Sequence, residues 1–457
     1  MNAARALYSL LTWCAQPLLR RKLRRRAVAE PGYAYAVGER FGRYPAPIDS
    51  LMPHSSTDPL GRFVWVHAVS LGETRAAAIL LAQLREQLPG VRLLLTHGTA
   101  TGRSEGEKLL LPGDVQVWQP WDTPGAVGRF LRKFRPAIGI LMETEVWPNL
   151  VAGCQQRGIP LVLANARLNE TSLRKAKRLS PLARPAYGGL TAVWAQAQED
   201  ATRLADIGAP VRGVLGNLKF DVVPDAQLLE RGREWRARTG RPVVLLASSR
   251  EGEEAMWLEQ IQKIWSKVPL AQINHADDAI NSEASDLPLP AVQWLIVPRH
   301  PQRFDEVHQL LQRAGLSVSR RSTWAAAPAA ADVWLGDSLG EMALYYGLAD
   351  VALLGGSFAP LGGQNLIEAA ACGCPVVLGP HTFNFAEAAE LACKAGAAQR
   401  VPDLAQGMAQ ATALAQDAHA HQEACERATR FAATHRGAAQ ATARAIVAMV
   451  QPEGGLH

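Results

Sequence analysis

The fold of the first half of the chain is decided by the stretch Trp65-Val66-His67-Ala68-Val69-Ser70-Leu71-Gly72-Glu73. An apolar run from Phe63 to Val69 predicts a buried strand, which stops at a turn that contains Gly72. A helical run then begins at Glu73. A strand followed by a tight turn and a helix directs the turn residues toward the carboxyl edge of a parallel sheet, where open α/β sheets bind their ligands. We therefore expect a functional crevice at this turn.

Glu73 is the residue of this stretch that is able to perform chemistry. A carboxylate at a helix N-terminus stays ionised, because the helix dipole and the free N–H groups favour negative charge. An ionised carboxylate in a crevice is a candidate general base. The alternative is that Glu73 only complements the dipole of its own helix, since acidic residues are common in first turns.

The composition describes a folded globular protein. The 457 residues suffice for two to three domains, and 48% hydrophobic with 20% charged residues excludes a disordered chain. The net charge of +6 suits an anionic surface or substrate. Basic and aromatic residues are not interleaved in the way that is typical of nucleic-acid binding. The six cysteines follow no zinc or disulfide spacing, which fits a reducing cytoplasmic compartment. The close pair Cys372 and Cys374 is interpreted as small buried residues, with a metal or redox role as the alternative.

The N-terminal segment predicts a membrane anchor. Residues 6–19 are mostly apolar, and the basic run 20–26 follows at once, which reverses the order of a secretory signal. The apolar stretch is shorter than the ~20 residues that a span usually needs. It either crosses a thin bilayer or lies in the interface with Tyr8 and Trp13 as anchors, and the basic run then meets anionic lipids on the cytoplasmic face. The alternative is a core helix followed by a solvated basic linker.

Strands and helices alternate in both halves, which predicts two doubly wound domains with parallel sheets. The expected strands are Phe63–Val69, Val91–Leu95, Val115–Gln119, Ala137–Met142, Pro160–Ala164 and Ala192–Ala195, and then Pro242–Ala247, Val292–Val297, Ser317–Ser319, Val333–Leu335, Val351–Gly355 and Pro375–Leu378. The polar stretch 271–290 is interpreted as a surface insertion, and the alanine-rich tail 403–450 as helices that pack across both halves.

Three loops in the second half follow expected strands and resemble parts of a nucleotide site. The first contains Arg299, whose forked cation suits phosphate. The second, Gly336-Asp337-Ser338-Leu339-Gly340-Glu341, offers backbone N–H groups to an anion. The third joins Gly355-Gly356-Ser357 to Gly362-Gly363-Gln364-Asn365-Leu366-Ile367-Glu368, where glycines predict a phosphate cradle and Glu368 a ribose contact. Glycine turns with capping residues are the alternative for each loop taken singly.

Several motifs narrow the class of chemistry. The chain has no P-loop motif, no His-Glu-x-x-His motif and no Asp-x-Asp pair that would hold a divalent cation against a nucleotide diphosphate. A two-domain, metal-free nucleotide-sugar transferase is the natural interpretation, with the nucleotide on the second domain and the acceptor on the first. Gly336-Asp337-Ser338-Leu339-Gly340 also matches the Gly-x-Ser-x-Gly elbow of hydrolases, so a Ser338 nucleophile is a weaker alternative.

The motifs resemble, nearly end to end, the 3-deoxy-D-manno-oct-2-ulosonic acid (Kdo) transferases of Gram-negative bacteria. The matching blocks are His67-Ala68-Val69-Ser70-Leu71-Gly72-Glu73, Glu143-Thr144-Glu145-Val146-Trp147-Pro148-Asn149-Leu150, Asn165-Ala166-Arg167-Leu168, Gly216-Asn217-Leu218-Lys219-Phe220-Asp221, Val297-Pro298-Arg299-His300-Pro301, Gly336-Asp337-Ser338-Leu339-Gly340-Glu341 and Gly379-Pro380-His381-Thr382-Phe383-Asn384-Phe385.

The resemblance implies an α/β GT-B fold, in which two Rossmann-like domains flank a cleft, and transfer of Kdo from CMP-Kdo to lipid IVA without a cofactor or a metal. It implies that Glu73 is the general base and that Glu143 and Lys219 support the transition state. It further implies that Pro298 and Arg299, Leu339 to Glu341, and Asn365 to Glu368 (with Leu366 and Ile367 between them) bind CMP. Glu143 is expected to open the helix after strand Ala137–Met142, where the alternative role is that of another helix-terminal carboxylate. A solvated surface lysine is the alternative for Lys219.

These expectations divide the chain into five parts. Residues 1–30 are the anchor and basic segment, 31–221 the acceptor domain, 222–240 a linker, 241–425 the CMP-sugar domain and 426–457 a C-terminal tail. The expected partners are CMP-Kdo, lipid IVA and anionic lipids at the cytoplasmic side of the inner membrane, and not nucleic acid.

Two departures from the family pattern concern the donor side. The family commonly has Thr-His where this chain has Ser249-Arg250, and Gly-Gly-His-Asn-Pro-Leu-Glu where this chain has Gln364 and Leu366 in place of the His and the Pro. A transferase or epimerase for a UDP-sugar, and an inactive nucleotide- or lipid-binding protein, are the competing hypotheses.

Overall fold

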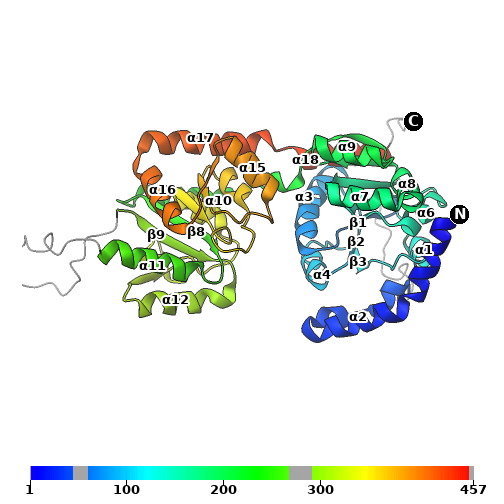
Figure 1. Ribbon diagram of the computed structural model, residues 1–457, viewed down its shortest axis with the longest axis horizontal. Coiled ribbons are helices and arrows are strands. Elements are labelled where there is room, and N and C mark those ends of the chain that lie inside the picture. Colours follow the sequence, from blue (N-terminus) through cyan, green and yellow to red (C-terminus); the bar gives the residue numbers. More distant parts are fainter. Residues whose placement is uncertain (1, 45–59, 267–290, 452–457) are drawn as a thin grey trace, which may run out of the picture. The chain divides into compact units, whose positions relative to one another are not determined.

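The computed structural model describes residues 2–44, 60–266 and 291–451, and the chain folds into two compact units (Figure 1). Unit 1 comprises Met1–Asp221 together with His435–His457, and unit 2 comprises Val222–Thr434. Within the described residues each unit contains a parallel sheet of seven strands. The expected surface insertion at 271–290 lies outside the described residues.

Unit 1 has the strand order β3-β2-β1-β4-β5-β6-β7. Its strands are β1 Val64–His67, β2 Leu93–His97, β3 Val115–Trp118, β4 Ile138–Met142, β5 Leu161–Ala166, β6 Ala192–Ala195 and β7 Val211–Val214. Its helices after the N-terminal segment are α3 Leu71–Gln87, α4 Ala100–Glu107, α5 Pro124–Phe134, α6 Pro148–Gln155, α7 Glu170–Arg178, α8 Ser180–Gly188, α9 Gln198–Asp206 and α18 Ala438–Val450. The order reverses between β1 and β4, so the crevice where such sheets bind ligands lies beyond the ends of these two strands.

Alternating side chains of the strands fill two apolar layers, one on each face of the sheet. In β1, Val64 and Val66 pack in the layer that holds α3 and α18, whereas Trp65 packs in the layer of α5 and α6. Both faces are therefore covered, which explains why the central strands read as continuous apolar runs.

Helix α18 joins unit 1 although more than 200 residues separate it from β7. Helix α18 lies beside α3 (Figure 1), and its Ala439, Ala443 and Ile446 are buried in the same apolar layer as α3. The Asp221 carboxylate accepts hydrogen bonds from the N–H groups of Gly437 and Ala439, and so it caps the start of α18.

Unit 2 has the strand order β10-β11-β9-β8-β12-β13-β14. Its strands are β8 Val243–Ser249, β9 Gln293–Pro298, β10 Val318–Arg320, β11 Val333–Leu335, β12 Val351–Leu354, β13 Val376–Leu378 and β14 Ala398–Arg400. Its helices are α10 Ala226–Ala237, α11 Glu253–Ser266, α12 Phe304–Arg313, α13 Met342–Leu348, α14 Leu366–Ala371, α15 Ala386–Lys394, α16 Leu404–Gln416 and α17 Ala418–Thr434. The order reverses between β8 and β12, which places the corresponding crevice at the ends of that pair.

The N-terminal segment forms two helices, α1 Ala3–Cys14 and α2 Gln16–Ala29, with Ala15 between them. No residue of α1 is buried, so the alternative of a core helix is wrong for it. The helix nevertheless contacts α6 and α8 of the same unit, because Ser9 Oγ donates to Asn149 Oδ1 at 2.9 Å and Asn2 Nδ2 donates to the Pro181 carbonyl at 2.9 Å. None of the described helices is both long and apolar enough to cross a membrane.

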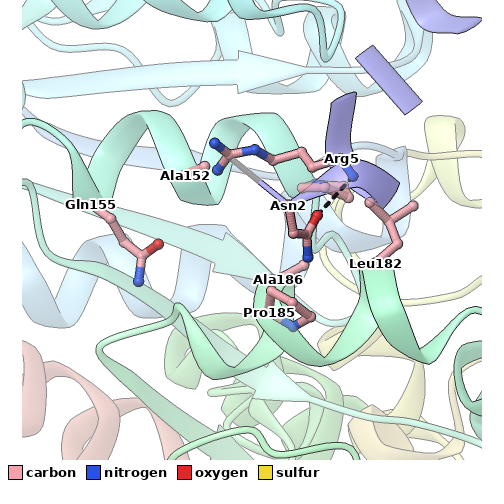
Figure 2. A pocket seen from close by; sticks show the side chains of 8 residues that line it. Asn2, Arg5, Ala152, Gln155, Leu182, Pro185 and Ala186 are labelled. Carbon is pink, nitrogen blue, oxygen red and sulfur yellow. Dashed lines mark hydrogen bonds between the residues drawn. The ribbon is translucent and has the colours of Figure 1, made fainter. Parts of the chain in front are cut away.

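A cavity of about 270 Å³ opens where α1 meets α6 and α8 (Figure 2). Asn2 and Arg5 line it from α1 and its cap, Ala152 and Gln155 from α6, and Leu182, Pro185 and Ala186 from α8.

The structure divides the chain differently from the expected boundaries. The expected linker at 222–240 contains α10, which packs closely on α13 because glycines lie in the contact: a Cβ at Gly232 would lie 2.2 Å from the Leu344 carbonyl oxygen. The alanine-rich tail is helical and contributes to both halves as expected, since α16 and α17 belong to unit 2 and α18 to unit 1.

Candidate active site

Glu73 lies in the first turn of α3, directly beyond β1. The helix begins at Leu71, two residues before the expected start, because Ser70 is its N-cap. Ser70 Oγ donates to Glu73 Oε1 at 3.0 Å, and the Val69 N–H donates to Glu73 Oε2 at 2.8 Å. These contacts resemble a capping box, so the carboxylate is fixed at the sheet edge and also stabilises its own helix.

Glu143 follows β4, the strand next to β1 at the switch point. The expectation that it opens a helix is wrong, because Glu143 adopts a left-handed conformation with φ +55° and α6 begins only at Pro148. The side chain is 4% exposed. Its Oε2 lies 2.8 Å from Arg167 Nε, and its Oε1 lies 3.5 Å from Lys219 Nζ. The structure thus brings Glu143 and Lys219 into a direct ion pair, and their roles in transfer stay a prediction.

The two cations reach Glu143 because the end of β5 is irregular. Asn165 has φ +52°, and the register between β5 and β6 shifts between Leu163 and Ala166. Asn165 Oδ1 accepts a hydrogen bond from the Leu218 N–H at 3.1 Å, which fixes the short 3₁₀ helix Leu218–Phe220 that carries Lys219. Asn165 Nδ2 is buried and has no hydrogen-bond partner among the described residues.

The carboxylates of this site shift one another's pKa. Burial and the charge of Glu143 raise the pKa of Glu73, whereas the hydrogen bonds from Val69 and Ser70 oppose the rise. Glu145 was not singled out from the sequence. Burial, together with the charge of Glu73, raises the pKa of Glu145 to about 7, and Trp147 Nε1 donates to its Oε2 at 2.9 Å. The signal in the sequence was its place two residues after Glu143, although nothing there indicated burial.

In unit 2, β9 ends at Pro298 and Arg299 follows it, beside β8 and its switch point. Pro298 is buried and Arg299 is half-buried. Arg299 Nε donates to Gln364 Oε1 at 3.1 Å. Gln364, which stands where the family commonly has a histidine, thus orients the Arg299 guanidinium, and we expect this guanidinium to meet phosphate.

The glycine loop after β12 differs from the expected phosphate cradle. Glu253, at the start of α11, is fully buried and accepts hydrogen bonds from the N–H groups of Gly356 at 2.6 Å, Phe358 at 3.1 Å and Ala359 at 3.3 Å. A protein carboxylate therefore already binds Gly356 N–H, one of the backbone groups of the expected phosphate cradle. Glu254, the next residue, accepts hydrogen bonds from both terminal nitrogens of Arg303, at 2.8 and 3.0 Å.

The loop of Leu339, Gly340 and Glu341 precedes α13. Gly340 has φ +78°, and the Leu339 side chain is exposed. Glu341 accepts from Arg321 Nη2 at 2.8 Å and also from Ser338 Oγ, whose other partner is Tyr345 Oη. A carboxylate and a phenol do not activate a serine as an imidazole does, so the structure does not support the Ser338 nucleophile.

The segment from Asn365 to Glu368 begins α14. Asn365 Oδ1 caps the helix by accepting the Ile367 N–H at 3.1 Å, and Glu368 is half-buried in the first turn. The side chains of Leu366 and Ile367 are buried in the core, so only their backbone is able to meet a nucleotide.

The remaining candidates have structural roles. Cys372 and Cys374 are buried with free thiols, which agrees with their interpretation as small core residues. Among the described residues, no group of three or more His, Cys, Asp or Glu side chains is placed to hold a metal ion.

Comparisons with known proteins place the chain in a family. The sequence model described as 3-Deoxy-D-manno-octulosonic-acid transferase (kdotransferase) matches residues 35–222. The 3-deoxy-D-manno-octulosonic acid transferase of Bordetella pertussis is 46% identical over 97% of this chain and 98% of its own length. The enzyme of the same name from Haemophilus influenzae (strain ATCC 51907 / DSM 11121 / KW20 / Rd) is 31% identical over 84% of both chains.

Solved structures share the fold at low sequence identity. A glycosyltransferase from Rickettsia africae ESF-5 has a TM-score of 0.50 and 12% identity, covering 86% of this chain and 100% of its own. MurG of Acinetobacter baumannii has a TM-score of 0.50 and 14% identity, covering 84% of this chain and 99% of its own. The two parallel sheets thus form the GT-B fold, as predicted. The relatives above, one of them 46% identical over 97% of this chain, show that the chain belongs to the 3-deoxy-D-manno-octulosonic acid transferase family of glycosyltransferases.

Proposed function

We propose that this chain transfers Kdo from CMP-Kdo to lipid IVA, the lipid A precursor, with inversion at the anomeric carbon and with Glu73 as the general base. The observation that carries this proposal is the position of Glu73 at the β1–β4 switch point, where the neighbouring strand supplies the Glu143 ion pair with Arg167 and Lys219. Membership of the Kdo transferase family supports Kdo as the sugar that is transferred.

In the proposed general base step, Glu73 of unit 1 accepts a proton. Glu73 takes the proton of the acceptor hydroxyl while the hydroxyl oxygen attacks the anomeric carbon of Kdo. The bond from that carbon to the phosphate oxygen of CMP breaks. A single displacement of this kind inverts the configuration. Burial and the charge of Glu143 raise the pKa of Glu73, which makes its carboxylate a stronger base than an exposed one.

Glu143 and Lys219 act in this proposal on the charges of the transition state. The anomeric carbon gains positive charge as the leaving group departs, and a fixed carboxylate stabilises that charge. Arg167 and Lys219 hold Glu143 in one orientation, so its charge needs no reorganisation during the reaction.

The donor nucleotide binds unit 2 in this proposal, at Pro298 and Arg299, at Leu339, Gly340 and Glu341, and at the segment from Asn365 to Glu368. Arg299 supplies positive charge to the phosphate of the departing CMP, and no metal or cofactor is assigned a role. The backbone of Leu366 and Ile367 contributes rather than their buried side chains.

We further propose that α1 and α2 attach the enzyme to the cytoplasmic side of the inner membrane. Leu7, Leu10, Leu11 and Trp13 of α1 are exposed, and exposed arginines of α2 follow them. An apolar surface next to basic residues suits the interface of an anionic membrane, where the lipid acceptor resides.

The test is to incubate the purified protein with lipid IVA and with CMP-Kdo generated in situ, and then to weigh the product by mass spectrometry. We expect a mass gain of one or more Kdo residues, which is lost in Glu73→Ala. Full transfer by Glu73→Ala would disprove the mechanism, and transfer only from a UDP-sugar would disprove the donor.

A further inference from the structure

The donor side of unit 2 needs more cations than the sequence motifs supply. Glu253 already accepts the N–H groups of Gly356, Phe358 and Ala359, and the Gly363 N–H donates to the Gly356 carbonyl at 2.8 Å. These four backbone donors are therefore not available to a phosphate. Binding of an acidic donor at this sheet edge must rely more strongly on side-chain cations.

Arg250 lies at the centre of this edge. It directly follows β8, which neighbours β9 on one side and β12 on the other. Arg299 follows β9, and the backbone N–H of Arg299 donates to the Ser249 carbonyl at 2.9 Å. The glycine loop follows β12. The switch point between β8 and β12 thus brings together Arg250, Arg299 and the glycines.

Close contacts connect the two arginines through the glycine loop. A Cβ on Gly356 would lie 3.4 Å from Arg250 Cγ and 3.2 Å from Gln364 Nε2, so both side chains pass over the bare backbone of this glycine. Gln364 Oε1 accepts a hydrogen bond from Arg299 Nε at 3.1 Å. Arg250, Gln364 and Arg299 therefore line one continuous surface above Gly356.

The charge of Arg250 is poorly compensated, in contrast to that of its neighbour Arg303. Arg303 is bound at both terminal nitrogens by the fully buried Glu254. The carboxylate that pairs with Arg250 is Glu251, at 3.0 Å, and this carboxylate is 54% exposed. A solvated ion pair of this kind is weak and is easily exchanged for another anion. Burial and the charges of Arg250, Arg299 and Arg303 also lower the pKa of His300, in keeping with a positive environment.

We propose that Arg250 is a second anion-binding residue of the donor site, which acts with Arg299 on the acidic groups of a nucleotide-activated acidic sugar. This inference rests on the proposed donor. Such a donor carries a phosphate and a sugar carboxylate, and two guanidinium groups on one surface match two oxyanions. Where the family commonly has a histidine, this chain has a side chain that stays charged at any physiological pH.

The experiment compares wild type with Arg250→Ala, Arg250→Lys and the control Arg313→Ala, whose side chain is exposed on α12. Calorimetry measures the Kd for CMP, which carries the phosphate alone, and steady-state assays measure the KM for CMP-Kdo, which carries both oxyanions. Loss of one charge-assisted hydrogen bond corresponds to roughly tenfold to a hundredfold in affinity. Urea unfolding checks that each variant is folded.

Each outcome decides the proposal. A weaker Kd for CMP in Arg250→Ala, with a smaller loss in Arg250→Lys and none in Arg313→Ala, assigns Arg250 to the phosphate. An unchanged Kd with a KM for CMP-Kdo raised about tenfold assigns it to the carboxylate. If both quantities match wild type in Arg250→Ala, the inference is overturned. Wild type that binds UMP instead of CMP would disprove the proposed donor alone, because loss of UMP affinity in Arg250→Ala would still support Arg250.

Discussion

Arg167 Nε lies 2.8 Å from Glu143 Oε2, so a largely exposed arginine holds a carboxylate that is almost completely buried. In Arg167→Ala, Glu143 keeps its ion pair with Lys219, whose Nζ lies 3.5 Å from Glu143 Oε1. We expect a loss of about 1–2 kcal/mol in the free energy of unfolding and roughly tenfold slower transfer, because the orientation of Glu143 is relaxed. Urea denaturation and initial rates measure both effects. Arg174→Ala on the exposed surface of α7 is the control, and equal behaviour of the two variants would contradict a role for the pair.

Glu73→Gln separates the two roles of Glu73. The amide still accepts a hydrogen bond at the N-terminus of α3, so the loss of stability should stay near 1 kcal/mol or below. An amide cannot take a proton, so kcat should fall by about 100-fold to 10,000-fold. Thermal unfolding and single-turnover transfer measure the two quantities. Wild-type turnover in this variant would mean that Glu73 serves only its helix.

Glu145 makes the stability of the protein depend on pH. Folding raises the pKa of Glu145 from 4.5 to about 7, so the folded state keeps a proton that the unfolded chain releases. Stability therefore falls as the pH rises from 4.5 through about 7. Glu145→Gln removes this contribution, so its gain in urea midpoint over wild type should be larger near pH 8 than near pH 5. The exposed Glu107→Gln serves as the control, and a gain that is independent of pH would refute the raised pKa.

Glu253 stabilises the glycine loop that follows β12. Glu253→Ala leaves the N–H groups of Gly356, Phe358 and Ala359 without their acceptor. We expect a loss of about 2–4 kcal/mol in stability and faster amide exchange in this loop, since several buried donors are unpaired at once. Hydrogen exchange with mass spectrometry measures the local effect. Protection of residues 355–359 at the wild-type level would show that the carboxylate is not their essential acceptor.

Membrane attachment is tested on the exposed face of α1. Leu10 is 57% exposed and Trp13 is 64% exposed, so the double variant Leu10→Glu with Trp13→Glu should fold normally. We expect at least tenfold weaker binding to vesicles that contain anionic lipid, because each buried apolar side chain contributes about 1.5–3 kcal/mol. Leu111→Glu is the control, since Leu111 is similarly exposed elsewhere in unit 1. Unchanged vesicle binding by the double variant would exclude α1 as the attachment surface.

The buried strands were the part of the fold most readily predicted from the sequence. All twelve expected strands are present with small shifts at their ends, because strands covered on both faces produce unbroken apolar runs. The strands β7 and β14 were missed. Each lies at the edge of its sheet and is partly exposed, so Val211–Val214 and Ala398–Arg400 interrupt apolar with polar or small residues.

The site was less predictable, because side-chain partners come from distant segments. The position of Glu73 followed from a strand, a turn and a helix that are adjacent in the sequence. The left-handed turn at Glu143 has no glycine or asparagine signal, so a helix start was the natural expectation there. The carboxylate of Glu253 beneath the glycine loop depends on a contact across more than 100 residues, and local sequence reasoning does not reveal such pairs.

The return of α18 to unit 1 fixes the order in which the enzyme is completed during synthesis. Helix α3 carries Glu73 at its first turn, and α18 covers the apolar face of α3. This covering helix leaves the ribosome only after all of unit 2 has been made. Unit 2 is one continuous stretch and is able to fold first, contrary to the usual order in which the N-terminal domain folds first. The half of the protein that carries the proposed base therefore acquires its complete core only when residues 438–450 have been made. A nascent chain interrupted before that point would hold a finished unit 2 and an unfinished unit 1.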